Sequence, residues 1–331
     1  MTLIQKVREF NNKQYKVNIK QYYFLTILIL FLTLSTILMG PYVRAEDAGL
    51  ACPDWPLCHG YVIPPLDYQI YLEFIHRIFA AFLGFFFLIW FFIGILFKPT
   101  YNKFFPYYIL SIFVLLVQIL LGRETITKQL NAYIVKFHLL NAIFFVSILF
   151  YIFFELRMHV HKQEFLNLST FYKDEWNILF LYSVIFLILV YFQIFLGGRV
   201  SANYVGLVCN QFPECYQQVI KQENREIINK IYLPPIIYGY EKHISHRIMA
   251  YFLFTYSLFL LPFYYKTKIL WREYLMTFSL LVFQICLGIL NIVFELPTII
   301  RVLHSFNSTI LFLSTLNIIF KLKYLIRNQK K

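Results

Sequence analysis

The chain has 331 residues, of which 60% are hydrophobic and 14% are charged. Eight separate apolar runs each approach the ~20 residues needed to cross a hydrocarbon core of ~30 Å, which excludes an ordinary soluble protein. The net charge is +13, but the basic residues are scattered over short loops, so we do not expect a nucleic-acid partner. The sequence therefore predicts an all-α integral membrane protein with eight transmembrane helices in a lipid bilayer.

The first 20 residues are polar and basic, which favours a cytoplasmic N-terminal segment. A transit peptide is the alternative, but Glu9 is acidic and no cleavage site is evident. We expect an N-terminal half at 21–160, a cytoplasmic linker at 161–176 and a C-terminal half at 177–325. The predicted spans are residues 21–41, 69–97, 104–122, 133–155, 177–197, 241–264, 270–291 and 299–320.

The distribution of basic residues predicts the orientation. The two termini and the loops after spans 2, 4 and 6 hold 18 basic and 6 acidic residues, whereas the opposite side holds 12 basic and 11 acidic residues. The positive-inside rule then puts both termini in the cytoplasm and the cysteine-containing loops outside. We expect the bacterial cytoplasmic (inner) membrane, with the mitochondrial inner membrane as the alternative.

The two halves of the chain repeat each other in three blocks, at shifts of 157, 170 and 166 positions. We interpret this pattern as a tandem duplication of a four-helix bundle. The two copies are expected to be parallel, because each has an even number of spans. The blocks pair Gly40, Cys52 and Cys58 with Gly197, Cys209 and Cys215; His76 and Arg77 with His246 and Arg247; and Gln118, Gly122, His138 and Asn141 with Gln284, Gly288, His304 and Asn307.

Four histidines fall at repeated positions near the outer ends of even-numbered spans. His76 and His138 belong to the first half, and His246 and His304 belong to the second. Two imidazoles that face each other across a helix bundle suit the axial positions of a haem iron. A zinc or copper site would usually add a third close ligand. The pattern predicts a bis-histidine haem in each half, and the alternative is packing histidines.

An arginine directly follows the first histidine of each pair. Arg77 and Arg247 could pair with haem propionates, or they could reach the lipid headgroups. Gln118 and Gln284 could bond to the histidines or lock the helix packing beside a glycine, and the sequence favours packing.

The cysteines recur with the spacing C-x5-C. In an oxidising compartment this predicts the disulfides Cys52–Cys58 and Cys209–Cys215, with a structural role favoured over a redox role. The spacing does not match the C-x-x-C-H motif that attaches c-type haem. His59 is therefore expected to be incidental.

Residues 49–60, Gly-Leu-Ala-Cys-Pro-Asp-Trp-Pro-Leu-Cys-His-Gly, are followed by the Glu-Phe-Ile-His-Arg segment at 73–77. Together with the histidines on spans 4, 6 and 8, these segments closely resemble the haem A synthase family. The resemblance implies an eight-helix membrane oxidoreductase that converts the C8 methyl of haem O to the formyl group of haem A, for cytochrome oxidase biogenesis.

The same resemblance assigns roles to the repeated sites. It implies a haem b cofactor with its iron between His246 and His304, a substrate haem O between His76 and His138, and Glu73 as the essential carboxylate. Haem O synthase and an unidentified electron acceptor are the implied partners.

The halves differ three positions before the first histidine, where Glu73 in the first half is replaced by His243 in the second. Only the first half has a carboxylate beside its haem, which fits one reacting and one electron-carrying site. Glu73 could accept protons or stabilise positive charge, and the alternative is a structural pair with Arg77. His243 is either a positioning partner or an exposed histidine.

The second cysteine loop lacks the Asp-Trp of the first and precedes an insertion at 216–233, which suits a lid or a homo-oligomer contact. Two rival functions remain open on this sequence. One is a di-haem b-type electron-transfer cytochrome, and the other is a non-catalytic membrane assembly factor.

Overall fold

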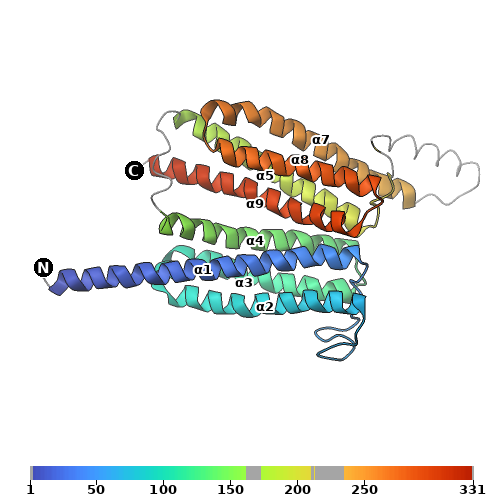
Figure 1. The fold of residues 1–331 in the computed structure, drawn as a ribbon, viewed down its shortest axis with the longest axis horizontal. Coiled ribbons are helices and arrows are strands. Elements are labelled where there is room, and N and C mark those ends of the chain that lie inside the picture. The colour runs from blue at the N-terminus through green and yellow to red at the C-terminus, as the bar shows by residue number, and fades with distance from the viewer. Residues whose placement is uncertain (1–2, 162–172, 210–211, 213–234, 330–331) are drawn as a thin grey trace, which may run out of the picture.

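A computed structural model shows a bundle of long helices (Figure 1). The structure describes residues 3–161, 173–209, 212 and 235–329. Within these residues eight helices are long and apolar enough to cross a membrane, and no strands form, which confirms the predicted all-α fold. The helices are α1 Leu3–Ala45, α2 Tyr68–Leu96, α3 Lys98–Thr127, α4 Ala132–Val160, α5 Lys173–Ala202, α7 Pro235–Thr267, α8 Trp271–Val293 and α9 Thr298–Gln329.

Most of the helices extend beyond the predicted spans. The first span was expected at 21–41, whereas α1 runs from Leu3 to Ala45 without a break. The apolar run marks the part that prefers lipid, and a helix satisfies its backbone hydrogen bonds equally well past that boundary. Most of the expected linker at 161–176 and the whole insertion at 216–233 lie outside the described residues.

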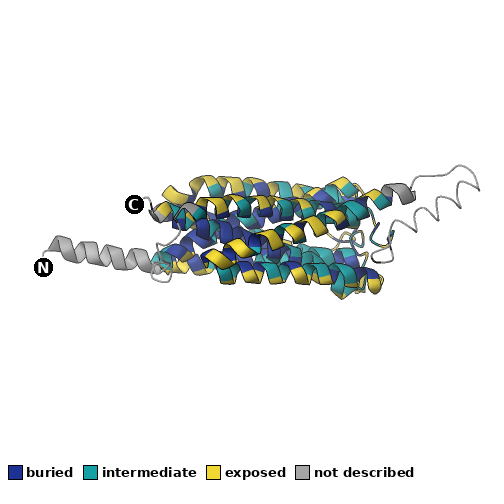
Figure 2. Cartoon of the chain, turned by 90° about the horizontal axis from the view of Figure 1, so that it is seen from above, coloured by how far each residue is buried: buried dark blue, intermediate teal, exposed yellow. Residues whose placement is uncertain are grey.

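Each half forms its own four-helix group. Helices α1 to α4 pack on one another, as do α5, α7, α8 and α9 (Figure 1). The groups meet where α1 contacts α9 and α4 contacts α5. In the most apolar windows of α4 and α9, 56% and 61% of the residues are buried, against 28% or less in the other spans. These two helices therefore form the centre of the bundle. Exposed residues lie along the outer helices (Figure 2), and many of them are large and apolar, as lipid contact requires.

Side-chain caps begin two helices of the first half at the end of the bundle that carries the cysteine loop. The carboxylate of Asp67 accepts hydrogen bonds from the backbone N–H groups of Gln69 and Ile70 at the start of α2. The side chain of Asn131 accepts from the N–H of Tyr133 at the start of α4. Such caps satisfy orphan donors of the first turn and thereby fix the helix starts from which His76 and His138 project.

Candidate functional site

The four repeated histidines lie near the starts of α2, α4, α7 and α9, and all four are half-buried. The first-turn ends of these helices are at the same end of the bundle (Figure 1). The site in each half is therefore built from the beginnings of two helices.

Each histidine packs against a glycine on the preceding helix. A Cβ added to Gly197 of α5 would lie 3.0 Å from Cε1 of His246. The same construction gives 3.2 Å between Gly288 and His304, 3.2 Å between Gly122 and His138, and 3.7 Å between Gly40 and His76. At three of these positions a larger residue would push the ring, so the glycines set the positions of the imidazoles.

The third and fourth helices of each half share a polar network. The side-chain N–H₂ of Asn141 donates to the carbonyl of Val114 at 3.0 Å and to Oε1 of Gln118 at 2.8 Å. The corresponding group of Asn307 donates to the carbonyl of Leu280 at 3.1 Å and to Oε1 of Gln284 at 2.8 Å. This recurrence supports the duplication, which itself stays a prediction.

The glutamines of this network also reach the histidines. Nε2 of Gln118 lies 3.3 Å from Nε2 of His138, whereas Nε2 of Gln284 donates to the backbone carbonyl of His304 at 2.9 Å. The sequence favoured a packing role for both. Of these two glutamines, only Gln118 contacts an imidazole nitrogen within the part of the chain that the structure describes.

The separation of the two histidine rings in the second half fits a bis-histidine haem. The ring centres of His246 and His304 are 6.4 Å apart. A metal–imidazole nitrogen bond is about 2 Å long, so two rings on opposite sides of one ion have centres about 6–6.5 Å apart. The Nδ1 atoms of His76, His138, His246 and His304 are buried and have no hydrogen-bond partner among the described residues.

The histidine pairs do not belong to a larger set of metal ligands within the described chain. No cluster of three or more His, Cys, Asp or Glu side chains suited to a metal ion forms there. Two imidazoles are the protein ligands of a bis-histidine haem, whereas a structural zinc centre has four ligands.

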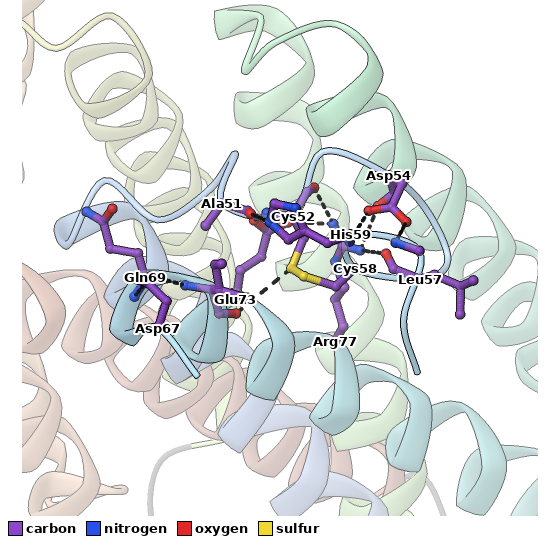
Figure 3. Close-up of a disulfide and its surroundings, with 12 residues drawn as sticks. Ala51, Cys52, Asp54, Leu57, Cys58, His59, Asp67, Gln69, Glu73 and Arg77 are labelled. Atoms are coloured by element: carbon purple, nitrogen blue, oxygen red, sulfur yellow. Dashed lines mark hydrogen bonds and ion pairs between the residues drawn. A yellow bond between two sulfur atoms is a disulfide. The ribbon is translucent and has the colours of Figure 1, made fainter. Parts of the chain in front are cut away.

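Glu73 is held by the cysteine loop and by Arg77 (Figure 3). Its side chain is buried, with 6% exposed. Oε2 accepts from the backbone N–H of Cys52 at 2.8 Å, and Oε1 accepts from Nη2 of Arg77 at 2.7 Å. The predicted structural pair therefore exists, and it places a charge-balanced carboxylate one helical turn before His76.

Arg77 also ties the loop to α2. Its terminal nitrogens donate to the backbone carbonyls of Cys52 at 2.9 Å, Asp54 at 2.7 Å and Leu57. The second half repeats part of this arrangement, because Nη2 of Arg247 donates to the carbonyl of Cys209 at 2.8 Å. The propionate role of both arginines stays a prediction, since their guanidinium groups bond these loops here.

His243 occupies the place that Glu73 has in the first half. It is buried, at 4% exposure, and its Nε2 accepts from Nε of Arg247 at 3.2 Å. Of the two interpretations from the sequence, the positioning partner fits and the exposed histidine is wrong. An imidazole nitrogen that accepts a hydrogen bond from a guanidinium carries no proton, so the His243 ring is neutral. The second half therefore has a neutral imidazole at the place where the first half has a carboxylate.

The first loop is closed by the predicted disulfide between Cys52 and Cys58. The Asp54 carboxylate accepts from the N–H groups of His59 at 2.6 Å and Gly60 at 2.7 Å, and these bonds hold its pKa below the usual 3.8. His59 contacts the carbonyl of Ala51 at 2.8 Å, which agrees with a structural role. Cys209 is buried, but Cys215 lies outside the described residues, so the second disulfide stays a prediction.

Residues 23–316 match the family described as cytochrome oxidase assembly protein. The chain belongs to this family. It is 32% identical over 327 residues to a heme A synthase of Shewanella oneidensis, covering 88% of this chain and 93% of the relative. It is 26% identical to a heme A synthase of Staphylococcus saprophyticus, covering 87% and 89%, and 25% identical to one of Rickettsia prowazekii, covering 83% and 90%.

Sequence reasoning did not predict the contacts between glycines and histidines in this member of the cytochrome oxidase assembly protein family. Gly40, Gly122, Gly197 and Gly288 all stand among the repeated residues, so the repeat contained the signal. Their role was not apparent because a glycine's partner on a neighbouring helix depends on how the helices pack.

Proposed function

We propose that this chain is a haem A synthase that oxidises the C8 methyl group of haem O to the formyl group of haem A. The family match and the similarity to heme A synthases of other bacteria support the activity. The observation that carries the proposal on the chain itself is the buried pair of Glu73 and Arg77 beside His76, against His243 and Arg247 in the second half. A membrane cytochrome that only transfers electrons would not need this difference.

His246 and His304 would hold a haem b cofactor, and His76 and His138 would bind haem O. The 6.4 Å separation of the ring centres in the second half supports axial ligation there. The unpartnered Nδ1 atoms in both halves are consistent with it. When bound, the iron supplies the redox chemistry, and the protein supplies orientation and charge balance.

Glu73 would take up a proton that leaves the methyl carbon. A carboxylate accepts a proton through one of its oxygens, and the two oxygens of Glu73 are held in place by Arg77 and by the N–H of Cys52. Protonation of Glu73 would weaken its bond to Arg77. The arginine would then keep its position through the loop carbonyls, so the site would not have to reorganise during turnover.

The cysteine loop would cover the reacting half from outside the membrane, with both termini in the cytoplasm. This orientation follows from the 18 basic and 6 acidic residues on the side of the termini. A haem O synthase would supply the substrate. Oxidation of the methyl to the formyl group would take its oxygen atom from water and release four protons, and a separate electron acceptor would remove the four electrons.

The test is haem O supplied to membranes that contain the chain, followed by pigment extraction and chromatography. A haem A synthase accumulates haem A above the level in membranes without the chain. A di-haem b-type electron-transfer cytochrome would bind haem and leave haem O unchanged. A non-catalytic assembly factor would show neither conversion nor a bis-histidine haem spectrum.

A further inference from the structure

A cavity of about 60 Å³ lies where the two halves meet, at the end of the bundle that carries the histidines. The starts of α4 and α7 and the end of α5 line it. Three of its lining residues are cationic, and none of the described ones is acidic. The lining consists of Ala132, Tyr133, Lys136, Arg199, Asn203 and Lys242.

Two of the cations are buried, which is costly for an ammonium group near a hydrocarbon layer. Lys136 is 8% exposed and Lys242 is 3% exposed. The Lys136 ammonium lies 4.6 Å from the ring centre of Tyr133 and 4.8 Å from that of Phe195. Aromatic faces stabilise a cation in this way and hold it at the cavity.

The positions that correspond to the three cations in the repeat carry no charge. The positions related to Lys136, Arg199 and Lys242 by the shifts of the repeat are Val302, Tyr42 and Leu72. Leu72 is buried in a small apolar cluster with Val43 and Ala48, against which Tyr42 packs. The cations at the other junction, Arg44 and Arg301, occupy different positions and donate to the backbone carbonyls of Ser201 and Ala45 across the two halves. The three cations around the cavity are therefore a feature of this junction that the repeat does not reproduce.

The surroundings of the cavity suit a lipid. Its cations lie close to the ends of their spans, which is the level of lipid headgroups. Phe192 of α5 and Ile248 of α7 are exposed about two turns further into the membrane, at 47% and 59%. We propose that this cavity binds the phosphate of an anionic phospholipid whose acyl chains lie along α4, α5 and α7. The proposal does not depend on the proposed enzymatic activity.

The experiment is native mass spectrometry of the purified haem-loaded protein with phosphatidylglycerol or with phosphatidylcholine of the same acyl chains. The wild type should retain phosphatidylglycerol preferentially. A variant with Lys136→Gln, Arg199→Gln and Lys242→Gln should bind it about tenfold more weakly or worse, because each basic residue adds attraction for an anionic headgroup. Lys128→Gln, which removes an exposed charge at the same end, should bind as the wild type does.

Three results would overturn the proposal. Equal retention of the two lipids by the wild type would show that the charge of the headgroup is not recognised, and this comparison needs no variant to fold. Unchanged retention by the triple variant, or by Arg199→Gln and Lys242→Gln made singly, would exclude the cavity. Full displacement of the lipid by an equal concentration of inorganic phosphate would indicate a site for a free anion.

Discussion

The backbone N–H of Cys52 donates a hydrogen bond to Oε2 of Glu73 at 2.8 Å. The acid on which the proposed chemistry depends is therefore bonded directly to a residue of the Cys52–Cys58 disulfide. Because Arg77 bonds both to Glu73 and to the loop carbonyls, the loop, the arginine and the acid form one unit. A substitution in any of the three should therefore shift the positions of the other two.

Arg77→Lys should loosen the cysteine loop. Lysine keeps the charge, but a single ammonium cannot reproduce the contacts that the guanidinium makes with three carbonyls and Glu73. Hydrogen bonds to charged groups contribute about 1.5–3 kcal/mol each, so we expect amide hydrogen exchange in residues 52–58 to become at least about tenfold faster. Arg123→Lys is the matched control, since Arg123 is half-exposed. Unchanged exchange in Arg77→Lys would contradict the coupling.

Alanine in place of each glycine that contacts a histidine should reduce haem binding. The loss should be largest where the added Cβ would lie closest to the imidazole. The Cβ of Gly197→Ala would lie 3.0 Å from His246, and that of Gly40→Ala would lie 3.7 Å from His76. Overpacking costs about 1–3 kcal/mol, so Gly197→Ala should lose haem from the second half, whereas Gly40→Ala should lose little. Haem absorbance per protein measures this.

Gly84→Ala is the control for the glycine series. Gly84 is also within a helix, but a Cβ there meets nothing within 4 Å. It should keep its haem and gain up to about 1 kcal/mol in helix stability. If Gly84→Ala lost as much haem as Gly197→Ala, the effect would not come from the imidazole contacts.

Substitution of single histidines should show which half binds which haem. His246→Ala should abolish the bis-histidine spectrum of protein made in cells without haem O, because the second half would then lack an axial ligand. His76→Ala should leave that spectrum and prevent binding of added haem O. His59→Ala, in the exposed loop, should change neither. A full haem b spectrum in His246→Ala would refute the assignment.

Asp54 should make the stability of the folded loop depend on pH only in acid, below about pH 3.8. The N–H of Gly60, and then that of His59, lowers the pKa of Asp54 below its ordinary 3.8. A lowered pKa stabilises the folded loop above pH 3.8, and that contribution is lost as the pH falls through the folded value. Amide exchange of His59 and Gly60, corrected for intrinsic rates, should therefore rise only below about pH 3.8. Asp54→Asn should show no such step, and a rise near pH 6 would contradict the assignment.

The spans and the sites were predictable from different signals. The length of the apolar runs gave all eight spans, because the hydrocarbon thickness fixes how long such a run must be. It did not give the helix ends, as α1 shows by starting at Leu3. The spacing of Cys52 and Cys58 correctly predicted their disulfide.

The contacts around Glu73 show where prediction from the sequence stops. The i, i+4 spacing suggested its pair with Arg77. The bonds from Arg77 to the carbonyls of Cys52, Asp54 and Leu57 join groups 20 to 25 positions apart, and backbone groups are the same in every residue. The burial of His243 likewise depends on the packing of its neighbours.

The most direct test of the account compares Glu73→Gln with Glu124→Gln in membranes supplied with haem O. Glutamine keeps the size of the side chain and removes the charge, so Glu73→Gln should retain bis-histidine haem and produce at least about a hundredfold less haem A, the lower end of what a positioned proton acceptor contributes. Glu124 is a partly exposed acid at the same end of the bundle, and Glu124→Gln should convert haem O normally. Normal production of haem A by Glu73→Gln would contradict the central claim.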